Sequence, residues 1–341
     1  MIYFDSDYMA GAHPEVLQRL IDTNLEHTVG YGCDQYTEQA INLIREACGA
    51  PKAQVFFMVG GTQTNATIID GILARHEGVL APESAHINVH EAGAIEATGH
   101  KVLTLPQHEG KVWADEVEHY IEEFYRDETF LHMVAPGMLY ISFPTEYGTV
   151  YTLSELEALS QVCHDAQIPL YIDGARLGYG LAAKDGNVTL KDIARLADVF
   201  YIGGTKMGTL MGEAVVVTNP ALLKNMTPLM KQHGALLAKG RLLGVQFATL
   251  FSNDLYLNIG RYAVELAITL KNEFFARGYD IVVDSPTNQQ FFRLPNDLID
   301  QLKQHASFEL WGPPGKTHSI VRFVTSWSTT YNDINRLIEL I

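Results

Sequence analysis

Residues 171–176, with the sequence Tyr-Ile-Asp-Gly-Ala-Arg, indicate the fold class of the chain. They continue a short apolar run, Leu170–Ile172, which an acidic residue and a glycine then end. Such short runs, typical of strands covered on both faces, recur along the chain at Val55–Val59, Leu139–Phe143, Val199–Ile202 and Ala214–Val217. Helical patterns such as Leu153–Asp165 lie between several of them. The sequence therefore predicts an α/β domain with a mostly parallel sheet flanked by helices.

The pattern of the sequence changes near residue 250. A long helical pattern, Leu255–Ala276, is followed by short strand candidates and by a last helix around residues 333–341. We therefore expect a large domain over residues 14–248 and a smaller C-terminal α+β domain over residues 249–341. No linker rich in glycine, serine or proline separates the two.

Composition restricts the kinds of partner and location that we expect. The 341 residues carry a formal net charge of −16, which would repel nucleic acid and anionic membranes. We find no signal peptide and no apolar stretch long enough to span a membrane. The three cysteines, Cys33, Cys48 and Cys163, form neither a disulfide framework nor a zinc pattern. A cytoplasmic protein without nucleic-acid or membrane partners fits these features.

Asp173 and Arg176 follow the run at residues 170–172 directly. The carboxyl ends of strands are where open α/β sheets build their sites. An aspartate at this place can stabilise a protonated heterocycle nitrogen, and the arginine fork can grip a carboxylate at two points. Taken alone, the pair is equally consistent with a strand-end aspartate that caps a turn and an arginine on the surface.

Lys206 follows the run Val199–Ile202 and the turn Gly203-Gly204. In this apolar, crowded setting, loss of water would lower the pKa of the amine and favour the neutral nucleophile. A solvated lysine or a phosphate-gripping lysine is the alternative, although Gly-Thr-Lys-Met is not a Walker A motif. Lys206 and Asp173 together predict pyridoxal 5′-phosphate (PLP), held as a Schiff base on Lys206 with its ring nitrogen against Asp173.

Two further segments are candidates for the same site. Gly60, Gly61 and Thr62 stand between a strand and a helix, where free N–H groups can cradle a phosphate. His86 can stack on a cofactor ring or transfer a proton. His86 and His90 have the i, i+4 spacing of a metal pair, but no further ligand motif accompanies them, so we expect no metal.

In these motifs the chain resembles the threonine aldolase and β-eliminating lyase family of fold-type I PLP enzymes. Asp173-Gly-Ala-Arg176 matches that family's Asp-Gly-Ala-Arg outright. The other matching positions, in chain order, are Ser6-Asp7, Tyr31-Gly32 with Asp34, Gly61-Thr62-Gln63 with Asn65, His86, Lys206 and Val321-Arg322. The resemblance extends over nearly the whole chain.

The resemblance implies cleavage of threonine or allo-threonine into glycine and an aldehyde, with Lys206, Asp173 and His86 as catalytic residues. Ser6, Arg176 and Arg322 would hold the substrate carboxylate. Residues 1–13 would lie near the active site. Tyr31, and Lys239 or Arg241 at the phosphate, would act across the interface of a homodimer or tetramer.

Departures from the family lie around the substrate. The lysine has Thr205 and Met207 as neighbours instead of serine and glycine. The usual Asn-Thr-His-Asn-Gly stretch appears as Pro144-Thr-Glu-Tyr-Gly148, which replaces a histidine with Glu146. A β-eliminating lyase or other amino-acid lyase on the same scaffold is the alternative. A non-catalytic protein would lack Lys206 or Asp173, and a nucleotide enzyme would need a glycine fingerprint that this chain does not have.

Overall fold

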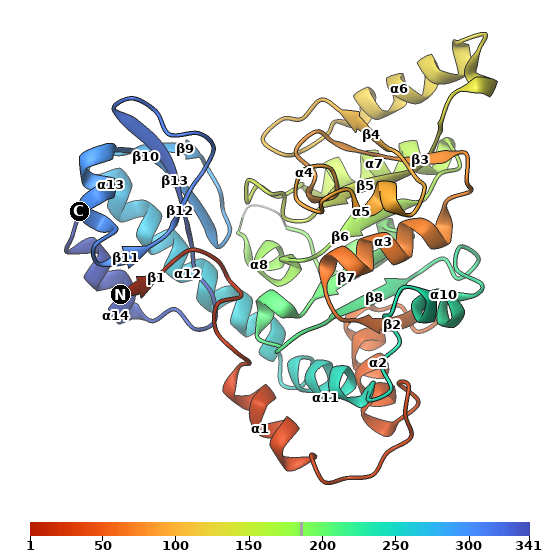
Figure 1. Ribbon diagram of the computed structural model, residues 1–341, viewed down its shortest axis with the longest axis horizontal. Coiled ribbons are helices and arrows are strands. Elements are labelled where there is room, and N and C mark those ends of the chain that lie inside the picture. The colour runs from red at the N-terminus through yellow and green to blue at the C-terminus, as the bar shows by residue number, and fades with distance from the viewer. Residues whose placement is uncertain (185–186) are drawn as a thin grey trace.

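The computed structural model describes residues 1–184 and 187–341. It consists of two units with the long helix α12 (Leu255–Ala276) between them (Figure 1). The first half of α12 packs into the core of the large unit, for example through Ile259. Its second half packs into the core of the small unit, for example through Phe274. One continuous helix therefore belongs to two hydrophobic cores.

The large unit contains a seven-stranded sheet with the order β2-β8-β7-β6-β5-β3-β4. Four neighbouring pairs are parallel, and only β8 runs against its neighbours β7 and β2. The strands are β2 (Gln54–Met58), β3 (Glu77–Pro82), β4 (Val102–Leu105), β5 (Ala135–Ser142), β6 (Leu170–Asp173), β7 (Val199–Gly203) and β8 (Glu213–Val217). The prediction of a mostly parallel sheet is confirmed.

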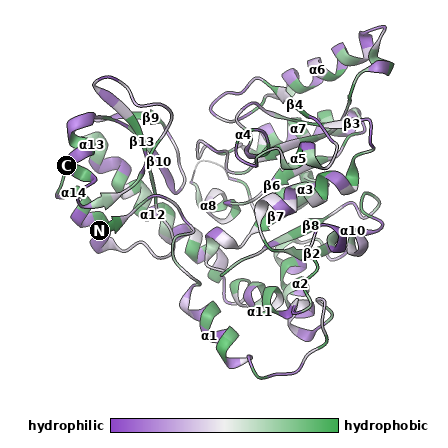
Figure 2. Ribbon diagram, in the orientation of Figure 1, coloured by the Kyte–Doolittle hydropathy of each residue, from purple (hydrophilic) through white to green (hydrophobic). Residues whose placement is uncertain are grey.

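Helices cover both faces of this sheet, and hydrophobic residues fill the space on each side. Along β5, Leu139 and Ile141 face one core while Met138 and Tyr140 face the other. These double-sided strands explain why the runs do not alternate in hydropathy; Figure 2 shows the central strands largely green. The helices of the large unit are α1 (Pro14–Asp22), α2 (Gln35–Cys48), α3 (Gly61–Ile72), α4 (His86–Val89), α5 (Ala94–Ala97), α6 (Ala114–Arg126), α7 (Leu153–Asp165), α8 (Leu177–Ala182), α9 (Leu190–Leu196), α10 (Met226–Gln232) and α11 (Arg241–Leu250), with 3₁₀ turns η1 (Phe130–His132) and η2 (Thr205–Met207).

Helix boundaries follow the signals in the sequence. Pro14 is the first residue of α1, a position that suits proline because its φ is already helical and its missing N–H would have no partner there. Asp34 caps α2, since its side chain accepts hydrogen bonds from the backbone N–H groups of Tyr36 and Thr37. Gly49 ends α2 with φ of 62°, a left-handed conformation that glycine adopts without strain.

The small unit has an antiparallel sheet with the order β12-β13-β10-β9. The N-terminal strand β1 pairs in parallel with β11, so the first residues of the chain pack against its C-terminal part. The remaining elements are β1 (Ile2–Tyr3), β9 (Asp280–Val283), β10 (Gln289–Pro295), α13 (Asn296–Leu302), β11 (Ala306–Ser307), β12 (Glu309–Leu310), β13 (His318–Val324) and α14 (Tyr331–Ile338). The described residues contain no helix with the length and apolar character needed to cross a membrane.

Candidate active site

Polar side chains converge where the strands of the large sheet end. β6 ends at Asp173, β7 leads through Gly203-Gly204 to Lys206, and β2 leads to Gly60 at the start of α3. Because β8 runs in the opposite direction, its first residue, Glu213, lies at the same edge. This edge is where open α/β sheets bind ligands.

Two adjoining cavities lie at this edge. The first, about 270 Å³, is lined by six of the predicted cofactor residues, namely Gly60, Gly61, Thr62, His86, Asp173 and Lys206, and also by Arg176. The second, about 300 Å³, contains Arg176 and Arg322 together. Five residues line both cavities: Tyr8, His86, Glu146, Arg176 and Lys206. The structure thus brings together residues that the sequence separates by as many as 314 positions (322 − 8).

Asp173 is buried and firmly held. Its Oδ2 accepts hydrogen bonds from the Tyr140 hydroxyl (2.5 Å) and from Asn65 Nδ2 (3.2 Å), while Oδ1 accepts one from Ala175 N (2.9 Å). Only 4% of the residue is exposed. These hydrogen bonds therefore fix the direction of the carboxylate at the carboxyl end of β6.

Lys206 stands in the short turn η2, and its backbone carbonyl accepts a hydrogen bond from the Tyr179 hydroxyl (2.6 Å). Within residues 1–184 and 187–341 its amine has no hydrogen-bond or ion-pair partner. Burial lowers the pKa of Lys206, and the nearby Arg176 charge lowers it further, against the opposing effect of Asp7, Asp173 and Glu213. A lowered pKa favours the neutral amine that a nucleophile needs.

The start of α3 leaves backbone donors free. Gly60 is the N-cap and supplies no side chain, and Gln63 uses its amide on Val59 N and on the His233 carbonyl. In the described part of the chain, the N–H groups of Gly61, Thr62 and Gln63 have no partner, as expected for a first helical turn. A Cβ added to Gly60 would meet nothing within 4 Å. The space above this turn suits an anion.

His86 is oriented by a buried carboxylate. Its Nδ1 lies 2.7 Å from Glu91 Oε1, which also accepts a hydrogen bond from Asn65 Nδ2 (2.7 Å). Since Asn65 also contacts Asp173, a continuous network joins His86 to Asp173. His90, which the sequence did not place in the site, lies in the wall of the second cavity.

Both arginines of the site already contact carboxylates of the chain. Arg176 Nε and Nη2 bind Asp7 at 2.7 and 3.0 Å. Burial would raise the pKa of Asp7, but the charges of Arg176 and Lys206 and the hydrogen bonds from Arg176 and Asn288 together outweigh it, so the pKa is lowered. Arg322 contacts Glu309 through Nη2 and Gln289 Oε1 through Nη1 (3.0 Å).

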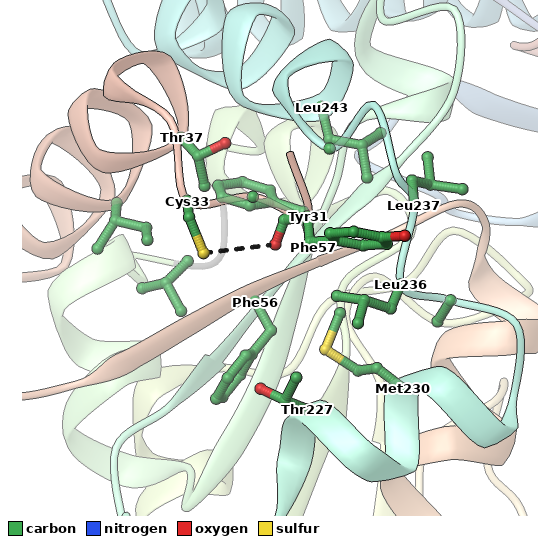
Figure 3. A pocket seen from close by; sticks show the side chains of 15 residues that line it. Tyr31, Cys33, Thr37, Phe56, Phe57, Thr227, Met230, Leu236, Leu237 and Leu243 are labelled. Carbon is green, nitrogen blue, oxygen red and sulfur yellow. Dashed lines mark hydrogen bonds between the residues drawn. The ribbon is translucent and has the colours of Figure 1, made fainter. Parts of the chain in front are cut away.

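Four predicted residues do not line either cavity, namely Ser6, Tyr31, Lys239 and Arg241. Arg241 donates hydrogen bonds to the backbone carbonyls of Glu26 and Thr23. Ser6 is buried next to Asp7, whereas Tyr31 and Lys239 are exposed on neighbouring segments. These segments are joined by the hydrogen bond from Tyr31 N to the Ala238 carbonyl (3.0 Å). Tyr31 lines a separate apolar pocket of about 320 Å³ beside α2, α10 and α11 (Figure 3).

Several residues of the site were missed by sequence reasoning. They are Tyr8, Glu91, Tyr140, Glu146 (noted only as a departure from the family), Glu213, Glu309 and Trp311. Burial raises the pKa of Glu213 to about 7. Glu213 is an acidic residue at the start of an apolar strand, and this unusual position could have marked it as a candidate site residue. Glu309 and Trp311 come from the small unit, and nothing in the sequence around them points to the site.

The architecture is that of the fold-type I PLP enzymes. Aspartate aminotransferase from Thermus thermophilus superposes with a TM-score of 0.73 over 100% of this chain and 90% of its own, at 13% identity, a likeness of fold alone. The sequence profile of the Beta-eliminating lyase family matches residues 4–291. The chain belongs to this family, which includes the threonine aldolases, and is an enzyme of the lyase class.

Two relatives are similar over their whole lengths. Threonine aldolase from Leishmania major is 40% identical, with a TM-score of 0.96 and coverage of 100% of this chain and 98% of that chain. Low specificity L-threonine aldolase from Pseudomonas aeruginosa is 29% identical, over 99% of this chain and 95% of its own. The family resemblance found in the sequence is confirmed.

Proposed function

We propose that the chain binds PLP at Lys206 through a Schiff base and uses it to cleave β-hydroxy-α-amino acids. Three features of the cavity support this cofactor. The free N–H groups beside Gly60, Gly61 and Thr62 suit its phosphate, Asp173 suits a protonated ring nitrogen, and the amine of Lys206 has the lowered pKa that an imine link requires. When bound there, PLP would withdraw electrons from the substrate's α-carbon.

The surrounding residues would keep these groups in place. His86 would lie against the ring, with its orientation set by the bond from Nδ1 to Glu91. Tyr140 and Asn65 would prevent Asp173 from turning away from the ring nitrogen. Positioning of this kind is expected for a site that must hold a planar cofactor at fixed contacts.

The proposed reaction is cleavage of the Cα–Cβ bond of L-threonine or L-allo-threonine to glycine and acetaldehyde. One observation carries the proposal: Lys206, Asp173 and two arginines meet at one pair of cavities. The names of the relatives from L. major and P. aeruginosa support the same reaction. β-Elimination on the same scaffold is the second candidate, because the matching profile is that of the β-eliminating lyases.

The products distinguish these two reactions. The PLP-loaded enzyme, incubated with L-threonine and separately with L-allo-threonine, is expected to release glycine and acetaldehyde in equal amounts. Release of a 2-oxo acid and ammonia instead would favour β-elimination. Absence of any product from several β-hydroxy amino acids would refute the proposed function.

Arg322 would bind the substrate carboxylate, with Ser6 and Arg176 nearby. It is 8% exposed, faces the second cavity and lies over Trp311, with its guanidinium carbon 5.1 Å from the ring centroid. Its present partner Glu309 comes from a short edge strand, and the Glu309 side chain is 44% exposed. A substrate carboxylate would therefore replace one partly exposed carboxylate on Arg322.

Arg322→Gln is expected to raise KM for L-threonine about 10- to 100-fold, because a charge-assisted contact contributes about 1.5–3 kcal/mol. Steady-state kinetics over a range of substrate concentrations would measure this. Arg293, which is exposed on the neighbouring strand β10, provides the control variant Arg293→Gln. An unchanged KM in Arg322→Gln would exclude Arg322 from carboxylate binding.

We further propose that the enzyme works as a homodimer or a homotetramer with shared sites. The first cavity contains Gly60–Thr62, and among the described residues the only arginine and lysine that line it are Arg176 and Lys206. Tyr31 lines the apolar pocket in Figure 3, and the exposed Lys239 directly precedes Gly240, which lines it too. In the proposed assembly, Tyr31 and Lys239 of one copy would reach the phosphate site of the other copy. Light scattering of the active enzyme is expected to give at least twice the chain mass; an active monomer would refute this.

A further inference from the structure

Glu146 is a carboxyl group in the wall of the candidate site, and none of the roles proposed above uses it. It lies in the loop that follows β5. Together with His86, Arg176 and Lys206, it lines both cavities. A carboxyl group that lines the same two cavities as Lys206 calls for a chemical explanation.

The loop that carries Glu146 is rigid. The backbone closes on itself through Thr145 N to the Thr149 carbonyl and Gly148 N to the Thr145 carbonyl, both at 2.9 Å. The Gly148 carbonyl accepts hydrogen bonds from the hydroxyls of Ser285 (3.1 Å) and Thr287 (2.9 Å) of the small unit. Gly148 has φ of +73°, and a Cβ there would lie 2.4 Å from Ser285 Oγ. Glu146 is therefore held at a fixed place.

One oxygen of the carboxyl group is fully engaged and the other is free. Oε1 accepts hydrogen bonds from Ser142 Oγ (2.7 Å) and from the backbone N–H of His86 (3.1 Å). Oε2 is shielded from bulk solvent and has no hydrogen-bond partner in residues 1–184 or 187–341. A buried acceptor without a donor is costly unless a ligand supplies the donor.

We propose that Glu146 accepts the proton of the substrate's β-hydroxyl group during cleavage of the Cα–Cβ bond. The inference rests on the proposed aldolase function and identifies the residue that would accept a hydrogen bond, and then the proton, from the substrate's hydroxyl group. The O–H bond breaks and its proton passes to Oε2, while its electron pair becomes the second bond of the aldehyde carbonyl. The Cα–Cβ pair remains on the carbon that becomes glycine Cα. That carbon gains one proton and Glu146 loses one, so protons balance over the cycle.

Both the charge of the site and the geometry of His86 favour Glu146 for this role. Burial raises the pKa of Glu146, and the charge of Asp173 also raises it, against the hydrogen bonds from Ser142 and the His86 amide. A carboxylate with a raised pKa is a better proton acceptor. His86, by contrast, would lie with its face against the cofactor ring and its Nδ1 bound to Glu91, so that only Nε2, at the edge of the imidazole, is left free. The titratable or charged groups that line the two cavities with Glu146 are Tyr8, His86, His90, Asp173, Arg176, Tyr201, Lys206, Glu213, Glu309 and Arg322. Burial raises the pKa of Tyr140 and Tyr151, and the charge of Glu146 also raises it.

Glu146→Gln separates this role from a structural one. The amide keeps the shape and an acceptor oxygen but takes up no proton, so kcat for L-threonine cleavage is expected to fall about 100-fold or more. Exchange of the α-hydrogen of glycine in D2O, followed by NMR, involves no hydroxyl group. The variant is expected to retain that exchange within about threefold of wild type.

Two further variants sharpen the test. Ser142→Ala removes a hydrogen bond to Oε1 but keeps the carboxylate, so cleavage is expected to fall less than about tenfold. Glu146→His supplies a different base, and should restore part of the cleavage rate and shift the acidic limb of its pH profile. On that limb the side chain at position 146 is protonated and cannot accept the hydroxyl proton, so kcat falls as the pH decreases through the pKa of this side chain.

Two results would overturn the inference while leaving the proposed function intact. In the first, wild type releases glycine and acetaldehyde, and Glu146→Gln cleaves within about threefold of it. In the second, the variant loses cleavage and glycine exchange in equal proportion, which indicates a structural role. If wild type cleaves no β-hydroxy amino acid, the proposed function itself fails.

Discussion

Replacing Lys206 with alanine is expected to lower kcat for L-threonine cleavage by about 10³-fold or more. The variant removes the only lysine that lines the two cavities in the described residues. Without it, the covalent link to the cofactor and the amine that returns a proton are both lost. Binding of the phosphate at α3 does not depend on this side chain, so the variant should still retain some PLP.

Lys224, which is exposed after β8, provides the matched control. Lys224→Ala should keep wild-type kinetics and the wild-type visible spectrum. A Lys206→Ala enzyme that retained more than about a tenth of the wild-type kcat would place the reacting amine elsewhere.

Asp173→Asn is expected to lower kcat by about 10²- to 10³-fold, the cost of losing one preorganised electrostatic contact in a dry site. The amide has the shape of the carboxylate, and Tyr140 and Asn65 remain as neighbours. What is lost is the negative charge that would keep the ring nitrogen protonated. Steady-state kinetics with saturating PLP would measure the effect.

Asp198 offers a control at the opposite edge of the same sheet. Its Oδ2 accepts a hydrogen bond from Leu170 N (3.0 Å), at the beginning of the strand that Asp173 ends. Asp198→Asn should reduce stability slightly and leave kcat unchanged. Equal kinetic losses in the two variants would mean that Asp173 acts through the fold and not on the cofactor.

Local patterns were enough to predict the main parts of the sheet and to place Asp173 and Lys206 at the ends of its strands. Asp173 and Lys206 each follow a buried run directly, and strand ends on a parallel sheet share an edge. The helix α12 was predicted with its observed ends. The strands β3 and β4 were not predicted, because only a few apolar residues mark them and Gly78 interrupts the first.

Contacts between distant segments could not be predicted in the same way. Arg176 was expected to be available to a substrate carboxylate, yet the structure pairs it with Asp7, 169 residues earlier. Glu309 and Trp311 reach the second cavity only because β12 pairs with β13, which carries Arg322. Such pairings depend on how the two units pack, and no pattern within a short window encodes them.

Reduction of the PLP-loaded enzyme with borohydride, followed by mass mapping of its peptides, tests the central claim most directly. Borohydride converts a Schiff base into a stable amine and so leaves the cofactor attached to the lysine that held it. The account predicts one modified peptide, with the pyridoxyl group on Lys206, and no such peptide in Lys206→Ala. Attachment at another lysine, or no attachment to a protein that has bound PLP, would contradict it.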